Sequence, residues 1–135
     1  MGNRRKAREC ALQVLFQVDF LQQEPHTILP LFWQSHPAKE DVRAFTERVV
    51  EGVWRNRAEI DALIESHSTN WRLDRMPAVD RNILRLATYE LLFEREIASS
   101  VTLNEAIEIA KRFGTEESGA FVNGVLDPIA RDLDK

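Results

Sequence analysis

Four cationic side chains, Arg4, Arg5, Lys6 and Arg8, lie within the first eight residues, with no acidic residue among them. The other 14 of the 18 basic residues and all 22 acidic residues follow, so the rest of the chain has a net charge of −8. Cations at the beginning of a helix oppose its dipole by about 0.3–1 kcal/mol per site, so their placement there indicates a use. Phosphate is the expected anionic partner, and the alternative is a solvated, frayed terminus.

A polar turn at residues 114–119, followed by Phe121 and Asn123, is a second candidate for binding. An aromatic ring beside hydrogen-bonding groups near the start of a helix can stack a splayed nucleic-acid base. The alternative is that Phe121 belongs to an apolar helix face with Val125 and Ile129.

Residue types that catalyse reactions or bind metals do not form a recognisable pattern. His26, His36 and His67 fall in or beside three different connections, and no glycine-rich phosphate loop occurs. Cys10 is the only cysteine, which excludes an intramolecular disulfide and a thiolate zinc site and fits a reducing cytoplasm. Its spacing from Ala7 and Val14 predicts a buried position. We therefore expect no catalytic residues, no metal and no cofactor.

The chain has 135 residues, a net charge of −4 and 44% hydrophobic residues, which is ordinary for a globular protein. Taken as an average, the acidic balance argues against a nucleic-acid ligand. No apolar run approaches the roughly 18 residues of a membrane span. The basic start does not begin a signal peptide, because Glu9 and Asp19 interrupt the apolar residues that follow it.

Apolar residues recur at spacings of three and four along almost every long segment, and no stretch alternates as a strand would. The fold class is therefore all-α. Seven helices are expected, at about residues 3–23, 27–35, 38–56, 58–67, 78–95 and 102–113, and from 115 onward. The helix at 78–95 is apolar on more than one face, which predicts a central element packed from several sides.

Polar residues predict where several of these helices begin. Asn3 is expected to cap the first helix, with Ala7 and Cys10 facing inward and the four cations outward. Thr102 and Glu105 have the spacing of a capping box. Thr115 is expected to cap the last helix, in which Pro128 predicts a kink.

Three segments carry a family resemblance: RRKARECALQVLF at 4–16, VDRNILRLATYEL at 79–91 and NEAIEIAKRFGTEESGAFVNGVLDPIA at 104–130. Together they resemble the NusB family of bacterial transcription antitermination factors, over most of the chain apart from about residues 24–70. The resemblance implies an all-α fold of two small helical bundles. We expect one domain over residues 1–135, with sub-bundles at about 1–67 and 68–135.

The resemblance also implies a function and partners. Members bind the boxA element of nascent ribosomal RNA transcripts together with NusE, a small-subunit ribosomal protein that doubles as a Nus factor. The complex joins RNA polymerase and the other Nus factors and lets the polymerase read through terminators. The chain is accordingly expected to be a non-enzymatic cytoplasmic factor with no membrane partner, and whether it forms a homodimer stays open.

The resemblance assigns two sets of residues in this chain. Those in the RNA-binding role are Arg4, Arg5, Lys6, Arg8, Glu117, Ser118 and Phe121, and those facing NusE are Phe16 and Asp80. Two departures matter: Ala120 stands where some members have a basic residue, and Phe16 stands where tyrosine is frequent. The three tryptophans, Trp33, Trp54 and Trp71, match no motif and are expected in core packing.

Two alternatives belong to other classes of protein. A NusB-like domain also forms the N-terminal part of a ribosomal RNA cytosine methyltransferase, and this chain reaches Lys135 without a methyl-donor fold. The other alternative is a helical scaffold that binds only proteins and has a solvated basic end. Under the RNA hypothesis, the acidic body orients RNA toward the basic end and leaves acids such as Asp80 free to meet a basic ribosomal protein.

Overall fold

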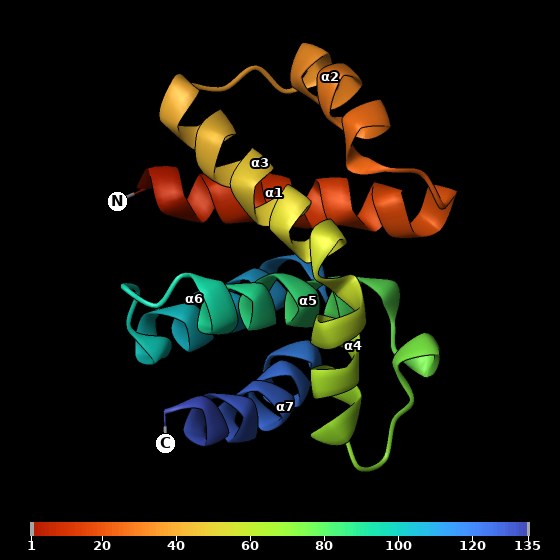
Figure 1. Ribbon diagram of the computed structural model, residues 1–135, viewed down its shortest axis with the longest axis vertical. Coiled ribbons are helices and arrows are strands. Elements are labelled where there is room, and N and C mark those ends of the chain that lie inside the picture. The colour runs from red at the N-terminus through yellow and green to blue at the C-terminus, as the bar shows by residue number, and fades with distance from the viewer. Residues whose placement is uncertain (1, 135) are drawn as a thin grey trace.

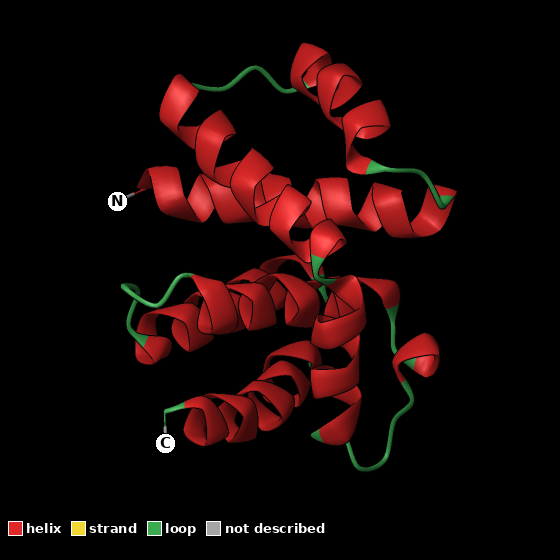
Figure 2. Ribbon diagram, in the orientation of Figure 1, coloured by secondary structure: helices red, strands yellow, loops and turns green. Residues whose placement is uncertain are grey.

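The computed structural model describes residues 2–134, and within them the chain is helical with no strand (Figure 2). The seven helices are α1 (Gly2–Leu21), α2 (Pro25–Ser35), α3 (Glu40–Arg55), α4 (Arg57–Ser66), α5 (Ala78–Phe93), α6 (Ser99–Phe113) and α7 (Ser118–Leu133). A single 3₁₀ turn at Leu73–Arg75 precedes α5. The all-α class and the seven helices are confirmed. Among the described helices, none is long and apolar enough to cross a bilayer.

The helices form two layers that meet at α5 (Figure 1). α3 crosses α1, and α2 packs against both, while α4, α6 and α7 lie on the other side of the molecule. α5 contacts α1, α3, α4, α6 and α7, which is the position that its apolar residues on several faces predict. α4 packs against α5 and α7. The division of the chain into two sub-bundles at about residue 67 stays a prediction.

Small and branched apolar side chains of α1 and α5 belong to the buried core. Ala7, Ala11 and Val14 of α1 are fully buried, as are Ile83 and Leu84 of α5. α1 packs against α2, α3 and α5, and short side chains on α1 let its neighbours approach closely, so side chains fixed to these helices are held in a defined relation.

The lone cysteine lies in this core. Cys10 is buried on α1, as its spacing predicts. Burial raises the pKa of the Cys10 thiol, which keeps it protonated at neutral pH.

The expected capping residues make other contacts, and three of the expected helix starts are wrong. α6 begins at Ser99 instead of Thr102; the Thr102 hydroxyl bonds to Glu90 and Glu105 bonds to Arg5, so neither acts as a cap. α7 begins at Ser118, and the Thr115 hydroxyl instead accepts a bond from the backbone N–H of residue 117, inside the preceding turn. α1 is helical from Gly2 onward, and the Asn3 side chain donates to Asp41 on α3. The side chains of Thr102, Glu105 and Asn3 bond to tertiary partners and are therefore not available as caps, whereas Thr115 bonds within its own turn.

Candidate nucleic-acid interface

The four cations at the start of α1 face different surroundings. Arg4 and Lys6 are exposed, and the Arg4 guanidinium lies over the Phe45 ring, 4.2 Å from its centroid. The side chain of Arg5 is 43% exposed, whereas that of Arg8 is only 4% exposed. The expectation that all four cations point outward is therefore wrong for Arg8. Arg8 follows Ala7 onto the face of α1 that packs against the rest of the fold.

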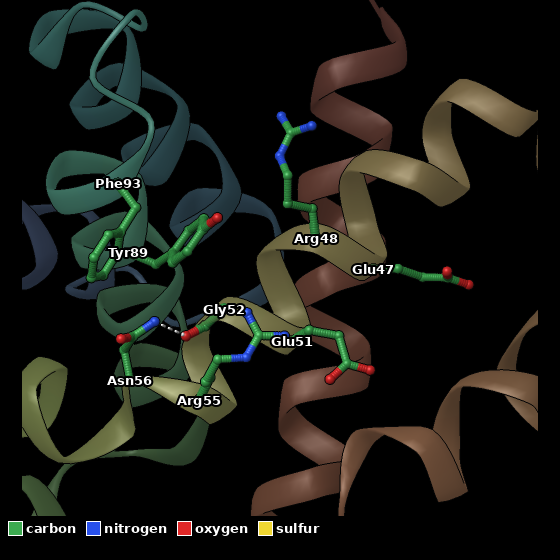
Figure 3. Close-up of a pocket in the computed structure, with 8 residues that line it drawn as sticks. All are labelled: Glu47, Arg48, Glu51, Gly52, Arg55, Asn56, Tyr89 and Phe93. Carbon is green, nitrogen blue, oxygen red and sulfur yellow. Dashed lines mark hydrogen bonds between the residues drawn. The ribbon is translucent and has the colours of Figure 1, made fainter.

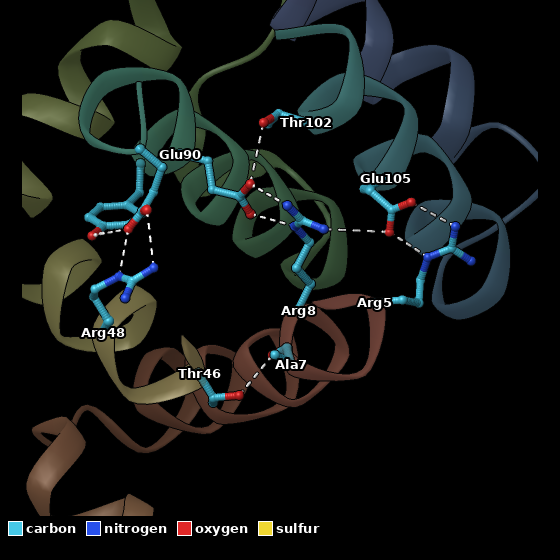
Figure 4. Close-up of polar contacts among 10 residues, drawn as sticks. Arg5, Ala7, Arg8, Thr46, Arg48, Glu90, Thr102 and Glu105 are labelled. Atoms are coloured by element: carbon cyan, nitrogen blue, oxygen red, sulfur yellow. Dashed lines mark hydrogen bonds and ion pairs between the residues drawn. The ribbon is translucent and has the colours of Figure 1, made fainter. Parts of the chain in front are cut away.

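Arg8 is held inside the protein by Glu90 of α5 (Figure 4). Its Nε and Nη2 donate to the two carboxylate oxygens at 2.8 and 2.9 Å, and the Thr102 hydroxyl of α6 donates to the same carboxylate. One residue earlier on α1, the carbonyl of Ala7 accepts a hydrogen bond from Thr46 of α3 at 3.0 Å. These bonds tie α1 directly to α5 and α3, with α6 joined through Glu90, and they set the rotation of α1 so that Arg4 and Lys6 face solvent.

Arg5 also has a carboxylate partner. Its Nε and Nη2 donate to the two oxygens of Glu105 on α6, the second at 2.8 Å, and Glu105 also lies 3.7 Å from Arg8. The hydrogen bond from Arg5 holds the pKa of Glu105 below its usual value, against the opposing effect of burial. The same bond raises the pKa of Arg5. The guanidinium of Arg5 is thus partly neutralised before any ligand arrives.

Lys111 and Arg112 at the end of α6 lie beside the two candidate RNA-binding segments, Arg112 at α1 and Lys111 at the start of α7. Arg112 donates to both carboxylate oxygens of Glu9 on α1, at 3.1 and 3.0 Å. A Cβ built on Gly119 of α7 would lie 3.7 Å from the Cγ of Lys111, so the Lys111 stem runs beside the start of α7. Sequence reasoning missed these residues as binding candidates, because their position at a helix C-terminus is already explained by the helix dipole.

An aromatic pair forms near the start of α7. The rings of Phe121 and Trp71 meet edge to face, with centroids 6.2 Å apart and an interplanar angle of 76°. Trp71 is 48% exposed, so the expectation that it belongs to the core is wrong, whereas Trp33 is buried as expected. Trp71 lies in the loop between α4 and α5, outside the helices whose apolar spacing predicts burial.

The turn before α7 is held by its own polar groups. Ser118 is buried, and its hydroxyl oxygen accepts the N–H of Thr115 at 2.9 Å. Gly114 permits this arrangement, because a Cβ there would overlap the Ser118 side chain. Glu117 is exposed beside it. Of the two polar residues predicted here, Ser118 shapes the turn and Glu117 faces solvent.

The two residues predicted to face a protein partner lie on α1 and α5. Phe16 is partly exposed and stacks on the exposed Phe20, with ring centroids 6.2 Å apart and planes within 5°. Beside them runs an open groove of about 290 Å³, whose lining includes Phe16, Val79 and Phe113. Asp80 is 5% exposed, so the expectation that its carboxylate is free at the surface is wrong.

A separate hollow of about 410 Å³ lies between α3 and α5 (Figure 3). Its lining residues are Glu47, Arg48, Glu51, Gly52, Arg55, Asn56, Tyr89 and Phe93. The Tyr89 hydroxyl donates to Glu94, which Arg48 also holds, and burial together with Glu94 raises the pKa of Tyr89 to about 12. The hollow contains charges of both signs, and none of its lining residues belongs to the two predicted binding sets. Within residues 2–134 no cluster of His, Cys, Asp and Glu has the arrangement of a metal site.

Comparison with known proteins gives consistent results for sequence and structure. Residues 5–131 match the model of the NusB family. The chain is 53% identical over 135 residues to the transcription antitermination protein NusB of Desulfatibacillum aliphaticivorans, covering 100% of this chain and 94% of the relative.

Two solved structures are similar over nearly their whole length. NusB of T. maritima superimposes with a TM-score of 0.89 at 45% identity, covering 96% of this chain and 91% of that one. A second structure, described as the antitermination factors NusB and NusE in complex with double-stranded RNA, superimposes with a TM-score of 0.90 at 30% identity, covering 98% of each chain.

Proposed function

The chain belongs to the NusB family, and from this premise we propose that it is a transcription antitermination factor that binds boxA RNA together with NusE. The observation that carries the proposal is that the end of α6 meets both candidate segments. Arg112 bonds to Glu9 of α1, and the Lys111 stem lies beside Gly119 at the start of α7, two residues before Phe121. On this proposal the protein acts in the cytoplasm on nascent ribosomal transcripts, within the assembly of RNA polymerase and the other Nus factors.

Arg4 and Lys6 make the main phosphate contacts in this proposal, because both are exposed. Arg5 and Arg112 supplement them through guanidinium groups that are partly exposed and already paired. Arg8 serves the site indirectly, by fixing α1 on α5 through Glu90. A buried guanidinium that donates to a carboxylate at two positions has no free face for a phosphate.

We assign the base contacts to Phe121 and Trp71. A half-buried ring with an exposed ring at its edge offers a platform on which unpaired bases stack. We assign to the exposed Glu117 hydrogen bonds from base amino groups, and Ser118 acts by holding the turn. Because Ala120 supplies no cation, contacts to the RNA phosphates come from α1 and α6 in this proposal.

For NusE we assign the stacked Phe16 and Phe20 with the adjacent groove. Aromatic side chains in a shallow apolar groove are the usual anchors of a protein interface. Asp80 is buried and follows Val79, which lines that groove, so it is not assigned a direct contact with NusE. The proposed NusE surface and the proposed RNA surface thus both include residues of α1, so the two partners bind along the same helix.

The function is binding and not catalysis. A curated relative that matches over the whole chain bears the name of a transcription antitermination protein, and this chain covers 94% of that relative's length. That near-complete overlap favours the antitermination factor over the alternative of one domain in a ribosomal RNA methyltransferase. The remaining alternative is a scaffold that binds only proteins, and a measurement of RNA binding distinguishes it from the proposed function.

The test is a titration of the protein against boxA RNA and a scrambled RNA of the same length, with and without NusE. Phosphate contacts to single strands change log K by about −0.7 per contact per decade of salt, so Arg4→Ala with Lys6→Ala should flatten the salt slope by about 1.4. These changes should weaken both RNAs alike, whereas Phe121→Ala and Trp71→Ala should weaken boxA RNA preferentially. Equal affinity for both RNAs, unaffected by NusE, would refute the proposed function.

A further inference from the structure

Two carboxylates hold two cations of the candidate RNA surface across the seam between α1 and α6. Arg5 of α1 is bonded through two nitrogens to Glu105 of α6 (Figure 4). In the opposite direction, Arg112 of α6 is bonded to both oxygens of Glu9 on α1. Each pair joins residues about 100 positions apart in the chain, and each places an acid inside a surface proposed to bind phosphate.

The cations of these pairs face solvent and the acids lie behind them. The side chains of Arg5 and Arg112 are 43% and 66% exposed, against 20% and 15% for Glu105 and Glu9. An approaching phosphate therefore meets a guanidinium that already has an anionic partner. The lowered pKa of Glu105 keeps that partner ionised at neutral pH.

We propose that Glu105 and Glu9 compete with RNA phosphates for Arg5 and Arg112, and so lower the affinity of this surface for the backbone of any RNA. The proposal rests on the RNA-binding function proposed above. A phosphate that takes Arg5 displaces a carboxylate, which must then recruit its own counterion, so the exchange gains little of the entropy that drives backbone binding. Base contacts near Phe121 then decide which RNA stays bound for long.

The size of the effect follows from the salt dependence. Freeing one arginine adds one full phosphate contact, which steepens the slope of log K against log salt by about 0.7. The contribution of counterion release to log K vanishes at 1 M salt. At 0.1 M salt, one added phosphate contact therefore tightens binding about fivefold. A role in which the carboxylates orient the arginines for phosphate predicts the opposite sign, because the free side chains would then bind more weakly.

The experiment titrates the full chain with boxA RNA and scrambled RNA at several salt concentrations. Glu105→Gln and Glu9→Gln keep the side-chain size and remove the charge, and each should bind both RNAs about fivefold more tightly at 0.1 M salt. Glu59→Gln, an exposed position at the start of α4, makes the same change in net charge far from the seam. This control should leave both affinities within about twofold of the parent.

A double variant tests whether the gain passes through the arginine. Arg5→Gln combined with Glu105→Gln should lose the gain of Glu105→Gln and its steeper salt slope, and thermal unfolding checks that each variant is folded. The competition is refuted by unchanged or weaker binding in both single variants, or by a gain that persists without Arg5. If the parent protein shows no salt-dependent RNA binding and Arg4→Ala with Lys6→Ala has no effect, the proposed function itself fails and this proposal fails with it.

Discussion

The buried pair of Arg8 and Glu90 predicts a large loss of stability when one partner is removed and a small one when both become apolar. The two side chains are bonded at 2.8 and 2.9 Å between α1 and α5, with 4% and 0% of their surface exposed. In an Arg8→Met variant the carboxylate of Glu90 stays in the core and keeps the hydroxyl of Thr102 as its remaining hydrogen-bond donor. One hydrogen bond from a neutral hydroxyl, at 3.3 Å, cannot replace the two bonds and the charge of a guanidinium.

The expected magnitude is large on the scale of a domain of this size. Breaking a buried ion pair by removing one partner costs about 3–5 kcal/mol, out of a free energy of unfolding of about 5–15 kcal/mol. At about 4 °C per kcal/mol, Arg8→Met should lower Tm by about 12–20 °C. Replacing Arg8 and Glu90 together by Met removes both charges, and this double variant should lie within about 1 kcal/mol of the parent.

Urea unfolding of the parent, both single variants and the double variant measures the coupling between the two residues. RNA titration of the double variant then separates the two roles of Arg8. A positioning role predicts parent-like RNA affinity and an unchanged salt slope, because the cations that contact phosphate are still present. A loss below 1 kcal/mol in Arg8→Met refutes the stabilising role, and a stable double variant with a flatter salt slope shows that Arg8 itself contacts phosphate.

Two further predictions concern the packing of α3 and the end of α7. Gly52→Ala should destabilise the protein by about 1–3 kcal/mol in urea unfolding, because its Cβ would overlap the ring of Tyr89. Gly124→Ala has open space around the new Cβ and should stabilise the protein by about 0.5–1 kcal/mol. A Gly52→Ala variant as stable as the parent would contradict the close packing. The hydrogen bond from His67 to Asp132, followed by that to the Leu63 carbonyl, raises the pKa of His67 above its unfolded value. This pair therefore stabilises fully below the unfolded pKa of about 6.5, and the stabilisation disappears as the pH rises through the folded pKa. Urea unfolding between pH 5.5 and 8.5 should show that decline in the parent and less of it in Asp132→Asn, and identical pH profiles would contradict it.

The helices could be predicted because their signal is local. Apolar spacings of three and four identify seven helices and the central position of α5, since a helix packed on several sides must be apolar on several faces. Helix starts were less predictable, because a hydroxyl or a carboxylate can serve either the backbone beside it or a distant partner. Thr102 and Glu105 have the spacing of a capping box, yet their partners are Glu90 and Arg5.

Residues of the candidate site were predictable as a set and not as individuals. The run of cations at the start of α1 identifies a basic segment, but nothing in it distinguishes the buried Arg8 from the exposed Arg4. That distinction depends on Glu90, which lies 82 positions away and reaches α1 only through the packing of α5. For the same reason Trp71 could not be paired with Phe121: the two rings meet only after α4, α5 and α7 are packed together.

The charge of the basic segment has to be counted after folding. Four cations stand at the start of α1, but Glu90 neutralises Arg8 in the core and Glu105 holds Arg5 at the surface. Folding also adds Arg112 of α6, which Glu9 holds in turn. Arg4 and Lys6 are thus the cations of α1 without a carboxylate partner among the described ion pairs. A surface with few unpaired cations binds RNA backbones weakly, so lasting complexes require the additional stacking that Phe121 can provide. The pairing of cations with acids, more than their number, is what would make an acidic protein selective among RNAs.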